Sequence, residues 1–347
     1  MTSTSTSDTA RAMSSSRDLL SVIVPVFNEA AVIQAFYDRA IRALAAIPGI
    51  HLELIFVDDG SSDDSHRQLA TLASLDSRVR VIRLSRNFGH QVAITAGLDH
   101  AHGDCVVVID ADLQDPPEVI EQMVEQWRAG FDVVYGVRAD RAGEGPLKLI
   151  TANMFYRLLN AITKINIPVD VGDFRLLSRR AADELRRLRE KDRFVRGLVS
   201  WIGFSQTGVS YHREARYAGQ TKYPYRKMIK FALDGVTSFS TMPLKIAMWM
   251  GYGSSVLAFL YLVSVVVQKL LGHTVQGWTT IMVAMLFLGG VQLICLGIIG
   301  EYVGRIFNES KARPLYVVDS VVGSRHGREP VTQAAVMVPG RRPGPTH

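Results

Sequence analysis

The chain has 347 residues, of which 48% are hydrophobic, and it carries a formal net charge of +6. Acidic and basic residues are interspersed through its N-terminal part, so this excess does not indicate a nucleic-acid-binding protein. The only two cysteines, Cys105 and Cys295, lie in a predicted core strand and in a long apolar run, respectively. A disulfide between them is not expected, which suits a reducing compartment.

Residues 1–17 are rich in serine and threonine and have no apolar periodicity, which predicts a disordered tail. After this tail, short β-branched runs alternate with stretches of helical periodicity. We expect strands at residues 20–26, 52–57, 79–84, 106–109 and 132–137, with helices at 29–46, 65–74, 91–100 and 117–129. This alternation is typical of an α/β fold with a mostly parallel sheet and helices on both of its faces.

The pattern becomes less regular after this series. We expect a helical, aromatic stretch at residues 148–160, a return segment at 169–176, and helices at 178–188 and 193–201. Residues 211–225 are dense in arginine, lysine and tyrosine. We interpret residues 18–222 as one domain.

Two long uncharged runs, residues 246–268 and 274–300, follow this domain. Each exceeds the roughly 20 residues needed to span the hydrocarbon core of a bilayer. The sequence therefore predicts a hairpin of two transmembrane helices within residues 246–304, at about 246–268 and 277–300. A pair of buried core helices is the alternative.

Basic residues flank the outer ends of this hairpin: Arg226, Lys227, Lys230 and Lys245 precede it, Arg305, Lys311 and Arg313 follow it, and the connecting loop has Lys269 alone. The positive-inside rule then places the large domain and a tail of residues 305–347 in the cytoplasm. Residues 223–245 mix apolar and basic side chains, as interfacial amphipathic helices do, but a simple connecting helix explains the pattern equally well. We expect the tail to be flexible from about residue 320.

Acidic residues follow several of the predicted strands. Asp110 and Asp112 come directly after the strand at 106–109, with Gln114 just beyond, and Asp58 and Asp59 end the strand at 52–57. Ligands bind open α/β sheets at the carboxyl ends of their strands, and closely spaced carboxylates repel unless a cation joins them. Oxygen ligands of this kind suit a hard divalent cation that also holds phosphate, although a polar loop would look similar. No glycine-rich dinucleotide fingerprint or Walker-type loop follows the first strand, so a nucleotide is not held in either of those ways.

Three segments together resemble the signature series of the family 2 GT-A glycosyltransferases: residues 24–29 (VPVFNE), 57–63 (VDDGSSD) and 110–118 (DADLQDPPE). More specifically, the chain looks like the polyprenyl-phosphate sugar transferases, which include dolichyl-phosphate mannose synthase and the bacterial bactoprenol glucosyltransferases. Segments similar to the bactoprenol branch are 86–91 (RNFGHQ), 172–176 (GDFRL), 196–201 (RGLVSW), 219–224 (GQTKYP) and 300–305 (GEYVGR). The resemblance runs from about residue 20 to 317. It implies a Rossmann-like GT-A fold, and one small departure is Phe27, where the family usually has tyrosine.

The resemblance also implies roles for individual residues. The nucleotide-sugar pocket would be lined by Pro25, Asn28, Glu29, Asp58, Asp59, Asp110 and Arg138. Asp110, Asp112 and Gln114 would hold Mg²⁺ or Mn²⁺, and through it the diphosphate. Asp173 resembles the acid proposed as catalytic base in the family, and we group it with Arg175 and Asp112 as catalytic. Because a lipid phosphate is already anionic at pH 7, we favour a role for Asp173 in orienting sugar hydroxyls or Arg175 over proton abstraction.

The acceptor phosphate needs positive charge to offset its repulsion from the diphosphate. Candidates are Lys148, which lies where mannose synthase-like members carry a basic residue, and Arg213, Arg216 and Lys222 just before the hairpin. Ordinary attraction of the last three to anionic headgroups is an equal alternative. His90 is either a pocket residue or a solvated loop residue.

We therefore expect an inverting glycosyltransferase in the inner (plasma) membrane, which moves glucose from UDP-glucose onto undecaprenyl phosphate on the cytoplasmic face. The alternatives are another donor, such as GDP-mannose or a UDP-linked amino sugar, and a non-catalytic membrane scaffold. A processive polysaccharide synthase would carry a Gln-x-x-Arg-Trp motif, which is absent. Gly300 and Gly304 have the spacing of packed membrane helices, which fits a homo-oligomer or packing within the hairpin.

Overall fold

A computed structural model describes residues 18–139, 171–214, 241–271 and 277–323 of the chain. Several predicted segments lie outside these residues: the N-terminal tail, the aromatic helix at 148–160, most of the interfacial region at 223–245, and residues 324–347. Lys148, Arg216 and Lys222 lie outside them as well.

The centre of the described part is one sheet with the strand order β7-β5-β6-β4-β1-β2-β3-β8. The strands are β1 (Asp18–Val26), β2 (Ile50–Asp58), β3 (Val79–Leu84), β4 (Cys105–Val108), β5 (Val133–Arg138), β6 (Val171–Ser178), β7 (Gln206–Tyr211) and β8 (Val318–Val322). β4, β1, β2 and β3 are parallel neighbours, as are β5 and β7, whereas β6 runs antiparallel between β4 and β5. The predicted mostly parallel α/β sheet is confirmed.

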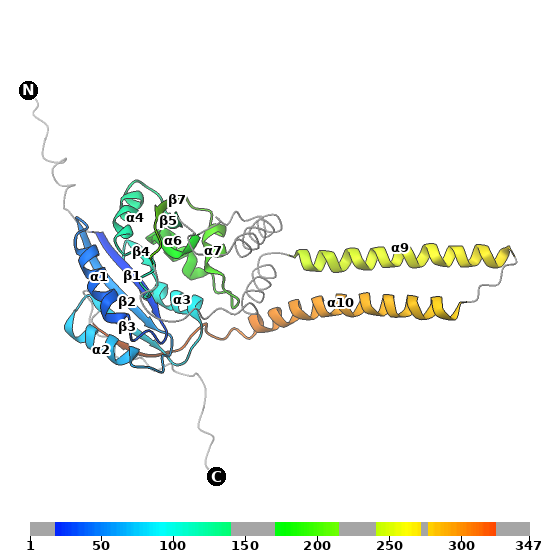
Figure 1. Cartoon of the computed structure of the whole chain (residues 1–347), viewed down its shortest axis with the longest axis horizontal. Coiled ribbons are helices and arrows are strands. Elements are labelled where there is room, and N and C mark those ends of the chain that lie inside the picture. The colour runs from blue at the N-terminus through cyan, green and yellow to red at the C-terminus, as the bar shows by residue number, and fades with distance from the viewer. Residues whose placement is uncertain (1–17, 140–170, 215–240, 272–276, 324–347) are drawn as a thin grey trace, which may run out of the picture.

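Helices cover both faces of this sheet (Figure 1). They are α1 (Ile33–Ala45), α2 (Ser65–Leu75), α3 (His90–His100), α4 (Val119–Arg128), α6 (Arg179–Arg187) and α7 (Val195–Trp201). α1, α2 and α4 pack with Leu54 and Phe56 of β2, and α3, α6 and α7 pack on the face that Ile55 and Val57 present. This alternation along one buried strand gives the two core layers, since successive side chains point to opposite faces.

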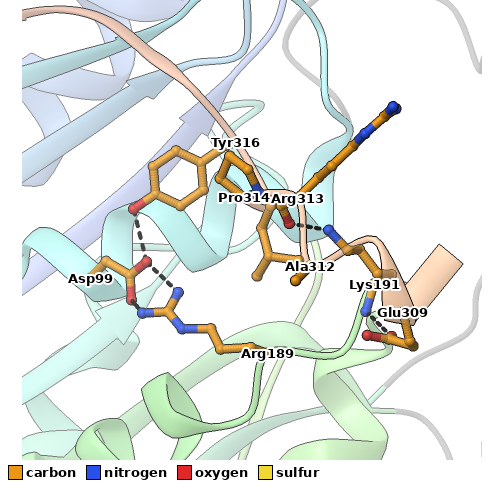
Figure 2. Close-up of a pocket in the computed structure, with 9 residues that line it drawn as sticks. Asp99, Arg189, Lys191, Glu309, Ala312, Arg313, Pro314 and Tyr316 are labelled. Atoms are coloured by element: carbon orange, nitrogen blue, oxygen red, sulfur yellow. Dashed lines mark hydrogen bonds and ion pairs between the residues drawn. The ribbon is translucent and has the colours of Figure 1, made fainter. Parts of the chain in front are cut away.

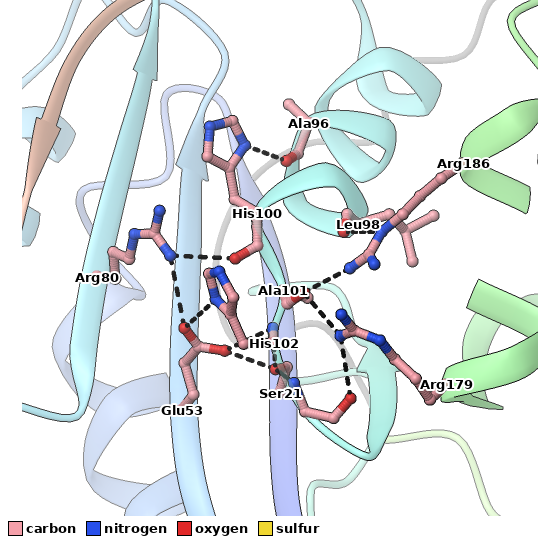
Figure 3. A network of polar contacts seen from close by, with 11 residues as sticks. Ser21, Glu53, Arg80, Ala96, Leu98, His100, Ala101, His102, Arg179 and Arg186 are labelled. Atoms are coloured by element: carbon pink, nitrogen blue, oxygen red, sulfur yellow. Dashed lines mark hydrogen bonds and ion pairs between the residues drawn. The ribbon is translucent and has the colours of Figure 1, made fainter. Parts of the chain in front are cut away.

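A polar network closes the edge of the sheet where the parallel strands begin (Figure 3). The buried carboxylate of Glu53 accepts hydrogen bonds from the Ser21 hydroxyl at 2.6 Å and from the backbone N–H of His102 at 3.2 Å. Arg80, itself 2% exposed, donates to the carbonyl of His100 at 3.0 Å. These contacts fasten the turn between α3 and β4, so this edge is structural and the opposite edge carries the site.

Two long helices, α9 (Met242–Leu270) and α10 (Trp278–Ser310), extend side by side from the sheet domain (Figure 1). Met242–Gln268 and Val283–Ser310 are long and apolar enough to cross a membrane, and neither span is buried inside the protein. α9 is longer than the predicted run at both of its ends, and α10 continues past Gly300 through charged residues such as Glu301 and Arg305 to Ser310. Among the described residues, and apart from the adjoining backbone of α10 itself, no atom lies within 4 Å of the position that a Cβ on Gly300 or Gly304 would take, so α9 does not pack on these two glycines.

The chain after α10 returns to the sheet, so the tail that we expected to be flexible from about residue 320 is instead ordered up to the end of a strand at Val322, and residues 324–347 lie outside the described residues. α10 continues to Ser310, and Val318–Val322 form β8, which pairs antiparallel with β3. The reason is that β3 would otherwise be an edge strand with free N–H and C=O groups. Val318 and Val322 pack against opposite core layers and hold the added strand in place.

Candidate active site

The antiparallel direction of β6 determines which residues meet at the carboxyl edge of the sheet. β1, β2 and β4 end there, and β6 begins there, because Val108 at the end of β4 lies opposite Arg175 near the start of β6. The register of β5 with β6 brings Val137 opposite Val171 at the same edge. The acids after β2 and β4, Asp173 of β6 and Arg138 of β5 are therefore assembled along one edge.

The loops after β1 and β2 are cross-linked into one rim. Asn28 adopts a left-handed conformation with φ of 55°, and its Oδ1 accepts from the backbone N–H of Ser62 at 2.8 Å. The backbone N–H of Glu29 donates to the Ser65 hydroxyl at 3.0 Å. Pro25 lies in β1 opposite Val57. The residues expected to line a nucleotide pocket thus form a fixed wall.

Asp58 and Asp59 are both buried, and their carboxylates order the neighbouring loops. Asp58 accepts from the backbone N–H of Ser61 at 2.9 Å and lies 3.6 Å from the guanidinium of Arg83. Asp59 accepts from the backbone N–H groups of Phe88 and Gly89 at 2.7 and 2.9 Å. Burial raises the pKa of Asp59 even though these two hydrogen bonds lower it. Asp59 therefore fixes the loop that leads into His90.

A glycine is required where this loop crosses the β2 loop. Gly60 has φ of 69°, which favours glycine, and a Cβ there would come within 2.5 Å of the Arg86 backbone. The segments 57–63 and 86–91 are therefore in direct backbone contact, which their positions in the sequence do not reveal.

Asp110 and Asp112 lie at the end of β4, as predicted. The backbone N–H of Gln114 donates to Asp112 Oδ1 at 3.1 Å, and Leu113 between them has φ of 59°. Burial raises the pKa of Asp110; the charge of His90 opposes this, and the carboxylates of Asp173, Asp115 and Asp112 add to it, bringing the pKa to about 6. The site has an excess of negative charge at this point.

Gln114 and Arg213, predicted for different ligands, are in contact. Arg213 donates to Gln114 Oε1 at 2.8 Å, and the backbone N–H of Glu214 donates to the Gln114 carbonyl at 3.0 Å. Tyr211 donates its hydroxyl proton to the buried Asp115. Arg39 of α1 pairs with both Glu118 and Glu214. The segment after β7 is thereby fastened along the loop that carries Asp110 and Asp112.

Asp173 is surrounded by donors and cations. The Arg196 guanidinium donates to both carboxylate oxygens at 2.9 and 3.2 Å, and Gln91 Nε2 donates to Oδ2 at 3.3 Å. His90 Nε2 lies 3.3 Å from Asp173 Oδ2 and 3.6 Å from Asp110 Oδ1. Burial raises the pKa of Asp173, but Arg196 and His90 outweigh it and hold that pKa well below its ordinary value.

His90 therefore lies between two acids at the carboxyl edge of the sheet, and its side chain is 39% exposed. Burial lowers the pKa of its ring, but the hydrogen bond to Asp173 and the charge of Asp110 prevail and raise the pKa to about 9. A pKa raised in this way favours the protonated ring at pH 7. The sequence left the position of His90 open, and the signal that could have placed it is its location just after the carboxyl end of β3, a parallel strand of the same sheet as β4.

Two further arginines lie beneath this cluster. Arg175 is 3% exposed and donates to the Gly172 carbonyl at 2.8 Å, and burial lowers its pKa to about 10. Arg138 lies beside Gly172, with its Nη2 3.0 Å from the position of a Cβ there. Among the described residues, neither arginine has an acceptor for its buried Nε. Sequence reasoning gave no role to Arg196 or Gln91, although both lie in segments that resemble the family.

Comparisons with known proteins agree with this architecture. Residues 21–186 match the family model for glycosyl transferase family 2, and residues 242–306 match that for the GtrB C-terminal hairpin. The uncharacterized glycosyltransferase YkcC of Bacillus subtilis is 51% identical over 89% of this chain and 95% of its own length. The bactoprenol glucosyl transferase of Shigella phage SfV is 43% identical over 86% of this chain and 97% of its own length.

Among solved structures, glucosyl-3-phosphoglycerate synthase from Mycobacterium tuberculosis, in complex with Mn²⁺, uridine diphosphate and glucosyl-3-phosphoglycerate, is 20% identical with a TM-score of 0.45. That similarity covers 64% of this chain and 80% of the other. The chain belongs to glycosyl transferase family 2. It is a glycosyltransferase with a GT-A fold and a C-terminal helical hairpin, and the predicted resemblance is confirmed.

Proposed function

We propose that this glycosyltransferase transfers glucose from UDP-glucose to undecaprenyl phosphate on the cytoplasmic face of the inner membrane, with inversion at the anomeric carbon. One observation carries the proposal: the acidic sheet edge and the two long apolar helices occur in one chain, and its similarity to a named bactoprenol glucosyl transferase covers both.

Asp110, Asp112 and Gln114 would hold a divalent cation, Mg²⁺ or Mn²⁺. Within the described residues, no group of three or more His, Cys, Asp and Glu side chains is arranged to bind a metal. That fits an open site, because Mg²⁺ bound with a substrate uses one or two carboxylates and completes its shell with phosphates and water. Burial is the main cause of the raised pKa of Asp110 and the neighbouring carboxylates add to it; a bound cation would favour the charged carboxylate against both. When bound, the cation would neutralise charge on the departing UDP.

The reaction itself needs little acid–base chemistry from the protein. An oxygen of the acceptor phosphate forms a bond to the anomeric carbon, while the bond from that carbon to the β-phosphate oxygen breaks and UDP takes the electron pair. The phosphate is already anionic at pH 7, so no proton has to be removed. What remains is positioning and relief of repulsion between two anions. Asp173 supports this, since it holds Arg196 and His90 in place rather than presenting a free carboxylate.

The membrane anchor is proposed on the same terms. α9 and α10 would span the bilayer as a hairpin, and the basic residues at its outer ends favour the cytoplasmic side for the catalytic domain. Arg213, together with Lys148, Arg216 and Lys222, remains a candidate for the acceptor phosphate. In this structure Arg213 contacts Gln114, so it lies next to the proposed cation position.

The test is transfer of radiolabelled sugar to undecaprenyl phosphate in detergent, with UDP-glucose, GDP-mannose and a UDP-linked amino sugar as parallel donors. We expect label in the lipid phase from UDP-glucose, lost with chelator and restored by Mg²⁺ or Mn²⁺. Asp112→Asn should lower kcat on the order of a hundredfold. Asp38→Asn is the matched control, because it makes the same chemical change on the exposed face of α1.

Transfer from a different donor would replace the sugar in the proposal and leave the acceptor. The absence of transfer from every donor, with lipid and metal verified, would favour the non-catalytic scaffold instead.

A further inference from the structure

Residues 188–194 connect α6 to α7, and they contact the C-terminal end of the long helix α10. We call this segment the linker. Arg305 of α10 pairs with Asp192 of the linker at 2.6 Å, and the backbone N–H of Lys191 donates to Glu309 Oε1 at 2.6 Å. The Lys191 ammonium also donates to the carbonyl of Arg313, as Figure 2 shows. The linker is therefore attached at three points to the end of α10 and the residues that follow it.

A second set of contacts joins a residue after α10 and the start of the linker to α3. Tyr316, just after α10, donates to Asp99 of α3 at 2.8 Å, and Arg189 at the start of the linker pairs with the same carboxylate at 2.7 Å. Asp99, Arg189 and Tyr316 help to line a pocket of about 620 Å³ between the C-terminal end of α10, the linker and α3 (Figure 2). The hairpin, α3 and the linker thus meet in one place.

The other end of the linker leads directly into the candidate active site. The backbone N–H of Val195, the first residue of α7, donates to Gln91 Oε1 at 3.0 Å. The next residue, Arg196, makes the two hydrogen bonds to Asp173, and Gln91 contacts Asp173 as well. Asp192, which pairs with α10, therefore comes only four positions before Arg196, which binds Asp173.

The linker is too firmly held to absorb a displacement between these ends. Arg193 is 8% exposed, and its guanidinium donates to the carbonyl of Leu185 in the last turn of α6 and to that of Leu188 at the start of the linker. Phe194 is 5% exposed and also buried in the domain. A shift of Asp192 would therefore move the start of α7, and Arg196 with it.

We propose that Asp192 and Arg305 are positioning residues for the transfer reaction: their ion pair sets the place of α7 relative to the hairpin, and so the place of Arg196 and Asp173. This inference rests on the proposed function. It gives a physical role to Arg305, in the segment 300–305 that the proposed function had not used, and connects it with Arg196. Through this pair, the distance of Asp173 from the bilayer depends on the position of α10.

The experiment uses the full-length protein in detergent and compares Asp192→Asn, Arg305→Gln and the double variant in the sugar-transfer assay. Each single change should lower kcat by about tenfold or more, because small misplacements at a reacting centre are costly. KM for UDP-glucose should stay the same, since the nucleotide rim does not touch the linker. The double variant should be no slower than the slower single variant, as expected for two partners of one contact. Asp192→Glu, which keeps the carboxylate, should recover most of the rate.

Two controls separate positioning from general damage. Glu184→Gln removes an exposed ion pair of 2.8 Å with Arg187 on α6, and it should leave kcat unchanged. The melting temperature should hardly change in Glu184→Gln and Asp192→Asn, because each removes one charge of an ion pair with an exposed partner, and such pairs add little to the free energy of unfolding. Hydrogen exchange of the α7 amides, Val195–Trp201, should be faster in Asp192→Asn than in wild type.

Unchanged kcat in both single variants, or multiplied losses in the double variant, would overturn the inference. Unchanged exchange in α7 would do so independently of any substrate. If the wild type itself transfers no sugar while α7 exchange still responds to Asp192→Asn, the proposed function fails and the coupling remains.

Discussion

Both oxygens of the Asp173 carboxylate are engaged by Arg196, and His90 and Gln91 approach the second of them. A general base works best when its pKa lies near the operating pH. The pKa of Asp173 is held well below its ordinary value, so the side chain is a weak proton acceptor at pH 7. This argues against proton abstraction by Asp173, in line with our expectation, but the expected hydrogen bond between Asp173 and Arg175 is not among the contacts of its carboxylate with described residues. The cationic neighbours are Arg196 and His90, however, whereas Arg175 bonds to the Gly172 carbonyl.

The ring of His90 offers a direct test of this arrangement. In the metal-free protein we expect its pKa to be about 9, because Asp173 and Asp110 stabilise the imidazolium. Asp173→Asn removes one of the two charges and should lower the pKa toward the ordinary value near 6.5. NMR titration of the histidine ring signals measures both. His51 serves as an internal reference, because it lies at the other end of β2 from Asp58 and the site. If His90 titrates identically in wild type and Asp173→Asn, the contact between His90 and Asp173 is contradicted.

Individual site residues were foreseeable only where a motif named them. Asp110, Asp112 and Asp173 could be listed from the sequence, but the contact of His90 with two of them joins β4, β6 and the start of α3. Likewise Arg39 reaches Glu118 and Glu214 from far away in the chain. Such pairs depend on strand order and direction, which local patterns do not specify.

At the scale of elements, one carboxylate joins α1, α2 and β3. Asp76, at the end of α2, accepts from Arg78 at 2.8 Å and from the Tyr37 hydroxyl at 2.7 Å. The hydrogen bonds from Arg78 are the largest cause that lowers its pKa, to about 2, from an ordinary value of 3.8. Because the folded-state pKa is depressed, the stabilising effect is present above about pH 4 and is lost as the pH falls through 2.

Asp76→Asn should therefore lower the free energy of unfolding by about 1 kcal/mol at pH 7, after allowance for screening by solvent. The difference from wild type should shrink between pH 4 and pH 2. Thermal unfolding followed by circular dichroism across this range is the measurement. Asp64→Asn is the control, since it removes an ion pair at the other end of α2 whose arginine is 81% exposed. A difference that is independent of pH would show that the carboxylate charge is not responsible.

The elements themselves were largely predictable, with two exceptions. The central strands and α1 to α4 follow from β-branched runs and helical periods, and they occur close to the expected residues. β7 was missed because Gln206–Tyr211 is short, contains Gly208 and buries only Val209 and Tyr211. β8 was missed because a five-residue strand after two apolar helices carries too little apolar pattern to distinguish it from a tail. Both lie at the edges of the sheet, where burial imposes the least pattern.

At the scale of the whole molecule, β8 links the hairpin to the outer edge of the sheet. Deleting residues 317–347 should expose the edge of β3, lower the melting temperature by at least about 3 °C, and increase light scattering during heating. Deleting residues 324–347 alone retains every residue of β8 and should melt like the full chain. If both deletions melt alike, the pairing of β8 with β3 contributes nothing to stability.

The overall plan, a parallel α/β sheet followed by two long apolar helices, could be predicted because composition changes sharply along the chain. The order of strands and the return of the chain to the sheet could not. They depend on pairing between residues such as Val81 and Val322, which are distant in sequence. We predicted domains that follow one another along the chain. In the structure, the hairpin is inserted in the sequence between β7 and β8, which belong to one sheet.

This interruption has a consequence in time. A ribosome completes β3 long before it reaches Val318, and both apolar helices are synthesised in between. Domains fold from the N-terminus during synthesis, so the outer edge of β3 waits unpaired while the hairpin emerges. The last strand is added only when the helices are finished. A nascent chain in which the hairpin forms late would thus keep the outer edge of β3 unpaired and prone to aggregation. Formation of the two helices would then limit the rate at which the enzyme finishes folding.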